Sequence, residues 1–107
     1  MKTEKVIMVW PEQPPEVASV TSFFLELLSL VNNTICCFYP FEADDICVIC
    51  YDNAKSLGLP YNRTILNPHT LESLGEMYGP FIILATNNGG LFRGLTEEEI
   101  NLYIKSI

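Results

Sequence analysis

Two short, uninterrupted apolar runs constrain the fold of this chain more than any other feature of its sequence. Residues 6–10 (VIMVW) and residues 81–85 (FIILA) contain no charged or strongly polar side chain. Each run is much shorter than the ~20 apolar residues that a membrane-spanning helix needs. A run of this length is typical of a β-strand that is covered on both faces. We therefore expect both segments to be central strands of a sheet.

Turn and capping residues divide the rest of the first half into further elements. Residues 12–15 (EQPP) predict a hairpin turn, and residues 16–20 predict a short edge strand that follows it. A helix is expected next, capped by Thr21 or Ser22 and closed by an asparagine pair. Its predicted apolar side comprises Phe23, Phe24, Leu27, Leu28, Leu30 and Val31.

The second half begins with two strands, over 34–41 and 46–52, joined by a short acidic turn. Residues 54–67 are expected to form an ordered loop. A short helix should then begin at Pro68, and its buried side would comprise Leu71, Leu74 and Met77. Asn and Gly residues after the second apolar run predict a turn, with a short edge strand over 91–93.

The last helix has the clearest boundary in the sequence. Thr96 is its expected N-cap, and Glu99, three residues later, completes a capping box. Its predicted apolar stripe comprises Ile100, Tyr103, Ile104 and Ile107.

These elements together predict an α+β fold of order ββαββ-α-β(β)-α. The sheet should be mostly antiparallel, with four to six strands and with the helices packed mainly on one face. Hydrophobic residues make up 49% of the 107 residues, which is enough for a core, so we expect a single domain over 1–107.

Charge and targeting features narrow the classes of partner. The net charge is −7, from 13 acidic and six scattered basic side chains, so direct nucleic-acid binding is not expected. No membrane segment or secretory signal is visible, and we therefore expect a cytoplasmic protein with reduced thiols.

The four cysteines are expected to be buried, inert thiols rather than a metal site. Cys47 and Cys50 form a C-x-x-C pair, but residues three apart in a strand point to opposite faces, and so do Cys36 and Cys37. A four-sulfur cage would have to break the hairpin. If residues 42–45 form the turn, Cys37 lies opposite Cys50, so a cross-strand thiol pair is geometrically possible, although a reducing compartment disfavours a disulfide.

No other group of residues predicts catalysis. His69 is the only histidine, and we expect it in an exposed loop or at a helix start. The acids 44–45 are explained by a solvated turn, and those at 97–99 by the first turn of a helix, where the helix dipole favours negative charge. We therefore expect no catalytic residues, no metal and no cofactor.

The segment 58–63 (GLPYNR) is the remaining candidate for a binding site. Tyr61, Asn62 and Arg63 supply an aromatic ring, an amide and a guanidinium, which suit an anionic or planar ligand. The competing interpretation, which we favour, is that Asn62 and Arg63 hydrogen-bond nearby backbone carbonyls and hold an irregular loop in place.

Several segments resemble an uncharacterised small-domain family found in bacteria, phages and conjugative elements. The most specific is the Gly-Leu-Pro-x-Asn-Arg segment at 58–63, and the others are DN at 52–53, GPFII at 79–83 and FRGLT at 92–96. The resemblance covers most of the chain and departs at 64–78. The family has no established activity, so the resemblance implies a mobile-element setting and no mechanism.

Two functions follow as hypotheses. The first is a non-enzymatic interaction protein, an accessory factor of phage or mobile-element origin that binds a host component. The alternative is a small-ligand binding module that uses Tyr61, Asn62 and Arg63, with a nucleotide as one candidate ligand. Mimicry of nucleic-acid charge is a weaker third idea, because the acids are spread along the chain. Apolar sheet edges such as residues 91–92 also permit a homodimer.

Overall fold

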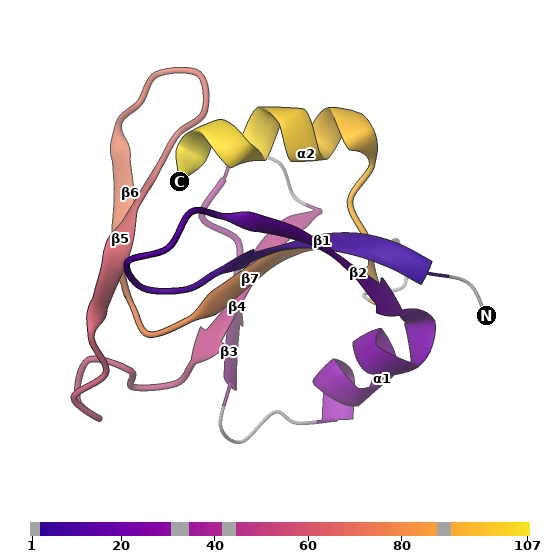
Figure 1. The fold of residues 1–107 in the computed structure, drawn as a ribbon, viewed down its shortest axis with the longest axis horizontal. Coiled ribbons are helices and arrows are strands. Elements are labelled where there is room, and N and C mark those ends of the chain that lie inside the picture. Colours follow the sequence, from indigo (N-terminus) through magenta and orange to yellow (C-terminus); the bar gives the residue numbers. More distant parts are fainter. Residues whose placement is uncertain (1–2, 31–34, 42–44, 88–90) are drawn as a thin grey trace.

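The fold is taken from a computed structural model that describes residues 3–30, 35–41, 45–87 and 91–107 (Figure 1). The described residues form eight strands and two α-helices. Their order is β1 (Thr3–Val9), β2 (Glu16–Thr21), α1 (Ser22–Leu30), β3 (Ile35–Phe38), β4 (Ile46–Tyr51), β5 (Tyr61–Leu66), β6 (Ser73–Tyr78), β7 (Phe81–Thr86), β8 (Phe92–Arg93), α2 (Glu97–Tyr103) and a final 3-10 turn, η1 (Ile104–Ser106).

The two apolar runs lie side by side at the centre of the main sheet. Its strand order is β2-β1-β7-β4-β3, with the short β8 paired to β7, and every pairing is antiparallel. Ile7 of β1 pairs with Ile83 of β7, and both side chains are fully buried. The prediction of two central strands is confirmed, as is the position of β2 at an edge.

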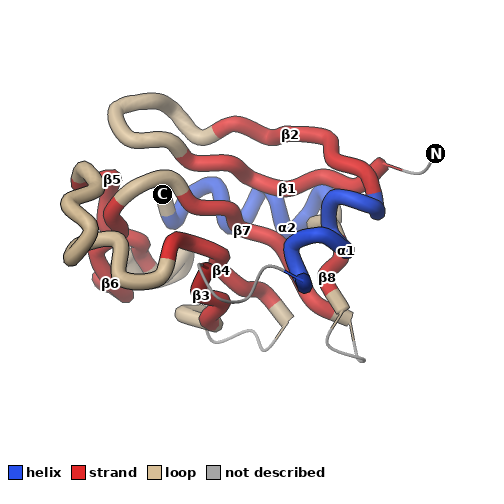
Figure 2. The backbone as a smooth tube through the Cα atoms, turned by 90° about the horizontal axis from the view of Figure 1, so that it is seen from below, coloured by secondary structure: helices blue, strands red, loops and turns tan. Residues whose placement is uncertain are grey.

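The helices cover opposite faces of this sheet, so the predicted fold class is wrong. On one face, here called the α2 face, the core includes Ile7, Val48 and Ile83 under α2 and η1. On the other, the α1 face, Leu25 of α1 packs in a cluster with Cys47. Figures 1 and 2 show the sheet between the two helices. Strands also dominate the fold, with eight in place of the predicted four to six.

The segment predicted as a loop followed by a helix is instead the β5–β6 hairpin, a separate two-stranded sheet. It packs on the α2 face, where Ile65 and Met77 are buried in the core. The pairing starts at Tyr61 opposite Tyr78 and contains two register shifts. Leu71, predicted to be buried, is 61% exposed at the tip of the hairpin and has a φ of 63°.

Helix α1 begins as predicted but packs differently. The Thr21 hydroxyl accepts a hydrogen bond from the Phe24 backbone N–H at 3.1 Å, which confirms the cap. The predicted apolar side is wrong in part, because Phe23 is 60% exposed and Leu27 is 42% exposed, whereas Leu25 is buried. The helix covers only part of the α1 face, beside β2 and β8 (Figure 2), and the side chains of Leu28 and Leu30 are not among those that the structure describes. The asparagine pair at 32–33 and Val31 lie outside the described residues.

The predictions of where helix α2 begins and of which of its side chains are buried are confirmed. Thr96 and Glu99 form both hydrogen bonds of a capping box. The Tyr103 ring is buried and lies 4.6 Å, centroid to centroid, from the ring of Phe41. Ile100, Ile104 and Ile107 pack against the same core. Neither α-helix among the described residues has the length and apolar character that crossing a membrane would require.

The β3–β4 pairing differs from the prediction by one residue. Cys36 lies opposite Cys50, and Cys37 lies opposite Ile49. A shift of one residue moves a side chain to the other face of a sheet. The predicted pair of Cys37 and Cys50 is therefore wrong, and the error came from the assumed turn at 42–45, of which residues 42–44 lie outside the described part of the chain.

Candidate binding site

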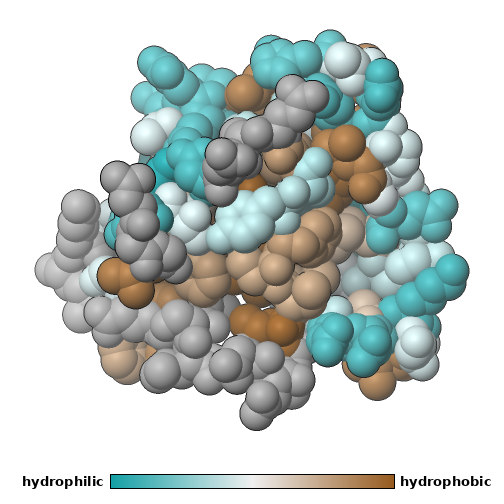
Figure 3. Space-filling model, turned by 180° about the vertical axis from the view of Figure 1, so that it is seen from behind, coloured by the Kyte–Doolittle hydropathy of each residue, from teal (hydrophilic) through white to brown (hydrophobic). Residues whose placement is uncertain are grey.

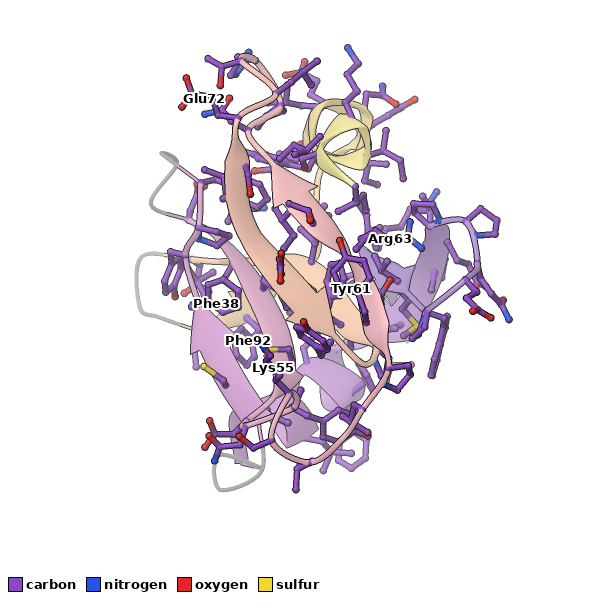
Figure 4. The ribbon with its side chains drawn as sticks, turned by 90° about the vertical axis from the view of Figure 1, so that its left-hand side faces the viewer. Phe38, Lys55, Tyr61, Arg63, Glu72 and Phe92 are labelled. Atoms are coloured by element: carbon purple, nitrogen blue, oxygen red, sulfur yellow. The ribbon has the colours of Figure 1, made fainter. Side chains whose placement is uncertain are left out.

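Two hollows lie on either side of the end of β4, and Cys50 and Tyr51 line both. The first, here called the Lys55 cleft, has a volume of about 460 Å³. It lies between the ends of β3 and β4, the loop after β4, and β6. Its walls include Phe38, Tyr51, Asn53, Lys55, Glu76 and Tyr78. Figure 4 shows Phe38, Lys55 and Tyr61 around this part of the molecule, with Glu72 at the far end of the β5–β6 hairpin.

The loop after β4 is a tight turn that fixes the position of Lys55. Asn53 has a φ of 56°, and its carbonyl accepts the Leu57 N–H at 2.9 Å. The carbonyl of Lys55 accepts the Gly58 N–H at 3.1 Å, and Gly58 has a φ of 77°, a conformation that glycine adopts without strain. These bonds present the Lys55 side chain toward β6.

The Lys55 ammonium lies over an aromatic ring. Its Nζ lies 5.5 Å from the centroid of the Tyr78 ring, within the range of a cation–π interaction. The Tyr61 ring meets the Tyr78 ring edge-on, with the centroids 5.6 Å apart. A cation beside aromatic walls is suited to a planar ligand that carries negative charge.

The second hollow, here called the apolar hollow, lies on the α1 face and has a volume of about 500 Å³. It is lined by Met8, Trp10, Phe24, Ile35, Ile49 and Ile82, among others. Trp10 is 46% exposed and Tyr51 is 47% exposed, so large apolar rings remain open to solvent there. Seen from behind, apolar surface also lies at the centre of the molecule, with hydrophilic side chains above it and to its right (Figure 3).

The predicted site residues Tyr61, Asn62 and Arg63 lie at the start of β5, and the structure places their polar groups against the protein. Asn62 is buried, and its side-chain amide donates to the carbonyls of Val9 (3.0 Å) and Gly79 (2.9 Å). Its Oδ1 accepts a hydrogen bond from Arg63 Nε at 2.9 Å. These bonds join the β5–β6 hairpin to the end of β1.

Arg63 extends this connection to the turn after β1. Its Nη2 donates to the carbonyl of Trp10 at 3.2 Å and also to that of Gln13. The Tyr61 hydroxyl is hydrogen-bonded to Thr64 Oγ1 at 2.7 Å, and its ring is 49% exposed. Ligand binding by these three residues stays a prediction, and Asn62 already uses both amide hydrogens within the fold. Lys55, which the sequence did not single out, is a cation that lines a cleft.

The remaining titratable groups are dispersed. Within the described ranges, no cluster of three or more His, Cys, Asp or Glu side chains is arranged to hold a metal ion. His69 is exposed in the turn of the β5–β6 hairpin, where its backbone N–H donates to Asn67 Oδ1 at 2.8 Å, so the first of its two predicted places, an exposed loop, is confirmed. Arg93 joins Asp45 and Glu99, each at 2.9 Å.

Burial raises the pKa values of the β4 thiols. The pKa of Cys50 is raised to about 11, chiefly by burial and further by its neighbours Cys36 and Asp52. Burial raises the pKa of Cys47 further still.

Fold and hollows together define a small protein with a central antiparallel sheet, one helix on each face, and a hairpin that helps to form a cleft. The chain belongs to the family described as "Domain of unknown function (DUF3846)", which matches residues 1–107. No curated protein matches the sequence, and no solved structure matches the fold.

Proposed function

We propose that this protein acts by binding a partner protein, whose apolar side chains enter the apolar hollow on the α1 face. The observation that carries this proposal is Trp10, which is 46% exposed beside a hollow lined almost wholly by apolar side chains. Exposed aromatic residues of this kind are enriched at the centres of protein interfaces. Binding would remove the Trp10 and Tyr51 rings from water.

Charge favours a basic partner. The chain carries 13 acidic and six basic side chains, and two exposed acids, Glu12 and Asp52, adjoin the aromatic rim in sequence. We therefore propose a segment with apolar residues between basic ones. The resemblance to a family of bacteria, phages and conjugative elements supports a host component as the partner of an accessory factor.

Trp10 is the only tryptophan and reports directly on this hollow. We expect its fluorescence emission to shift to shorter wavelength when the protein is titrated with synthetic peptides in which a Leu-Phe pair lies between arginines. Peptides with glutamates in place of the arginines should bind more weakly. Met8→Asp, on the hollow, should abolish the shift, and Leu71→Asp, at the distant hairpin tip, should preserve it.

Two outcomes would contradict the proposal. One is an unchanged emission with every peptide, or a shift that Met8→Asp leaves intact. The other is a shift that depends on protein concentration without peptide, which would make a second copy of this chain the occupant of the hollow.

The Lys55 cleft supports a second candidate function, the binding of a small planar anion such as a nucleotide. Lys55 over the Tyr78 ring is the specific observation in its favour. Nucleoside monophosphates should raise the melting temperature of the wild type and of Lys105→Met, an exposed control, but not that of Lys55→Met. Arg63→Ala should still respond. If the rise in melting temperature is lost in Arg63→Ala and kept in Lys55→Met, the ligand instead binds at residues 61–63.

A further inference from the structure

The β3–β4 hairpin carries two thiol pairs, one on each face of the sheet. Cys36 and Cys50 are direct partners in the register and share the α2 face. On the α1 face, Cys37 lies opposite Ile49 and is diagonal to Cys47. Neither pair is bonded in this structure.

The first pair meets the geometric requirement of a cross-strand disulfide. Directly opposed residues in antiparallel strands have Cα atoms about 4.5–5.5 Å apart, and disulfides span Cα distances of about 4.4–6.8 Å. The Cys36 and Cys50 thiols interact with each other across the strands, and so do the Cys37 and Cys47 thiols, so it is the register that distinguishes the two pairs. The diagonal pair is less favourable, because diagonal neighbours lie about 7–8 Å apart.

Access distinguishes the pairs as well. Cys36 and Cys50 are both half-buried; Cys36 lies on the edge strand β3, and Cys50 lines the Lys55 cleft. Cys47 is fully buried at the centre of the opposite cluster, which keeps it from reagents in solution. Among the four thiols, only Cys36 and Cys50 combine direct opposition with partial exposure.

We propose that Cys36 and Cys50 are a reversible oxidation site, which a small-molecule disulfide such as oxidised glutathione converts to a cross-strand disulfide. The Cys36 thiolate attacks one sulfur of oxidised glutathione and releases one glutathione thiolate, which leaves a mixed disulfide on Cys36. The Cys50 thiolate then attacks the Cys36 sulfur, forms the protein disulfide and expels the second glutathione. Two protein thiols are oxidised and one glutathione disulfide is reduced, and the two protons lost by the protein thiols are taken up by the two glutathione thiolates.

The bond would form in one wall of the Lys55 cleft, since Cys50 lines it. It would also fasten β3 to β4 at a point where β3 has no other strand partner among the described residues.

Because the pKa of Cys50 is raised to about 11, its thiolate fraction should rise about tenfold per pH unit below that value. The rate of the step that closes the disulfide should rise in the same proportion.

Mass spectrometry after incubation with oxidised glutathione tests this site. We expect the wild type to lose two hydrogens and to keep two of its four thiols. Cys36→Ser and Cys50→Ser should not lose them, and the matched control Cys37→Ser/Cys47→Ala should. Cleavage after Glu42 separates the two strands in sequence, so wild-type peptides joined through Cys36 and Cys50 provide a measurement that does not depend on the folding of any variant.

Three results would overturn the proposal. The first is a wild type that gains only glutathione adducts. The second is a two-hydrogen loss that persists in Cys36→Ser. The third is a cross-link mapped to Cys37 or Cys47.

Discussion

Asn62→Ala tests whether the buried amide is the main polar connection between the β5–β6 hairpin and the sheet. The substitution removes two buried hydrogen bonds, to the carbonyls of Val9 and Gly79, and the acceptor of Arg63 Nε. A typical hydrogen bond contributes about 0.5–1.5 kcal/mol, and buried groups left without a partner cost more. We therefore expect the free energy of unfolding to fall by about 3 kcal/mol.

The assay is urea unfolding followed by circular dichroism, with the slope of the transition as a check on two-state behaviour. A loss of this size corresponds to a melting temperature lower by roughly 12–24 °C for a domain of about 100 residues. Arg63→Ala is the neighbouring control, because its bonds to Trp10 and Gln13 are exposed to solvent, and it should cost about 1 kcal/mol.

A double-mutant cycle isolates the bond between the two side chains. Because Arg63 donates directly to Asn62, the double variant should lose less stability than the sum of the two single variants. The reasoning fails if Asn62→Ala costs less than Arg63→Ala, or if the effects of the two substitutions simply add.

Three further predictions concern other parts of the fold. Ile65→Ala should lower the free energy of unfolding by about 2–5 kcal/mol because Ile65 is buried in the core. Leu71→Ala, at the exposed tip of the hairpin, should change it by less than about 0.5 kcal/mol. Similar values for the two variants would mean that the hairpin is not part of the core. Gly94→Ala should lower the free energy of unfolding by about 1–3 kcal/mol, since a Cβ there would lie 2.5 Å from the Glu4 Cβ and 2.7 Å from the Lys5 backbone nitrogen. A variant as stable as the wild type would refute this close packing. The hydrogen bond from Arg93 lowers the pKa of Glu99 in the folded state. The stability that this bond contributes is therefore present above about pH 4.3, the usual pKa of a glutamate, and is lost as the pH falls through the lowered pKa. Glu99→Gln should remove that part of the pH dependence in urea unfolding between pH 7 and 3, and the exposed Glu98→Gln should not.

The local elements with strong sequence signals were predictable. Residues 81–85 are apolar throughout, and β7 is accordingly central. Thr96 and Glu99 define a capping box that requires only local contacts, and it forms as expected. In both cases the physical cause lies within a few neighbouring residues.

The β5–β6 hairpin was not predictable by the same reasoning. Leu71, Leu74 and Met77 recur at a helical spacing, and Gly75 is a poor strand residue, so the local pattern favours a helix. The strand is stabilised instead by tertiary contacts, among them the burial of Ile65 and Met77 on the α2 face. Such contacts can override local preference.

The candidate site was missed for a related reason. A lone lysine such as Lys55 carries no motif, and it becomes notable only when Tyr78, from a distant strand, is placed beneath its ammonium. The thiol register failed because it depends on the length of a turn, and an error of one residue exchanges Cys36 for Cys37. The face of the sheet that each helix covers likewise depends on how the helix is connected to the strands, which the pattern of residues within the helix does not determine.

The position of β7 has a consequence for biosynthesis. β1 and β4 are both paired to β7. The edge of β1 that carries Ile7 opposite Ile83 therefore has no strand partner until β7 has been synthesised. On the ribosome, the β1–β2 and β3–β4 hairpins are made early, and each would expose an apolar edge until the last quarter of the chain emerges. We expect slow folding, because distant strand pairing is slow, and aggregation of nascent chains that stop before residue 81.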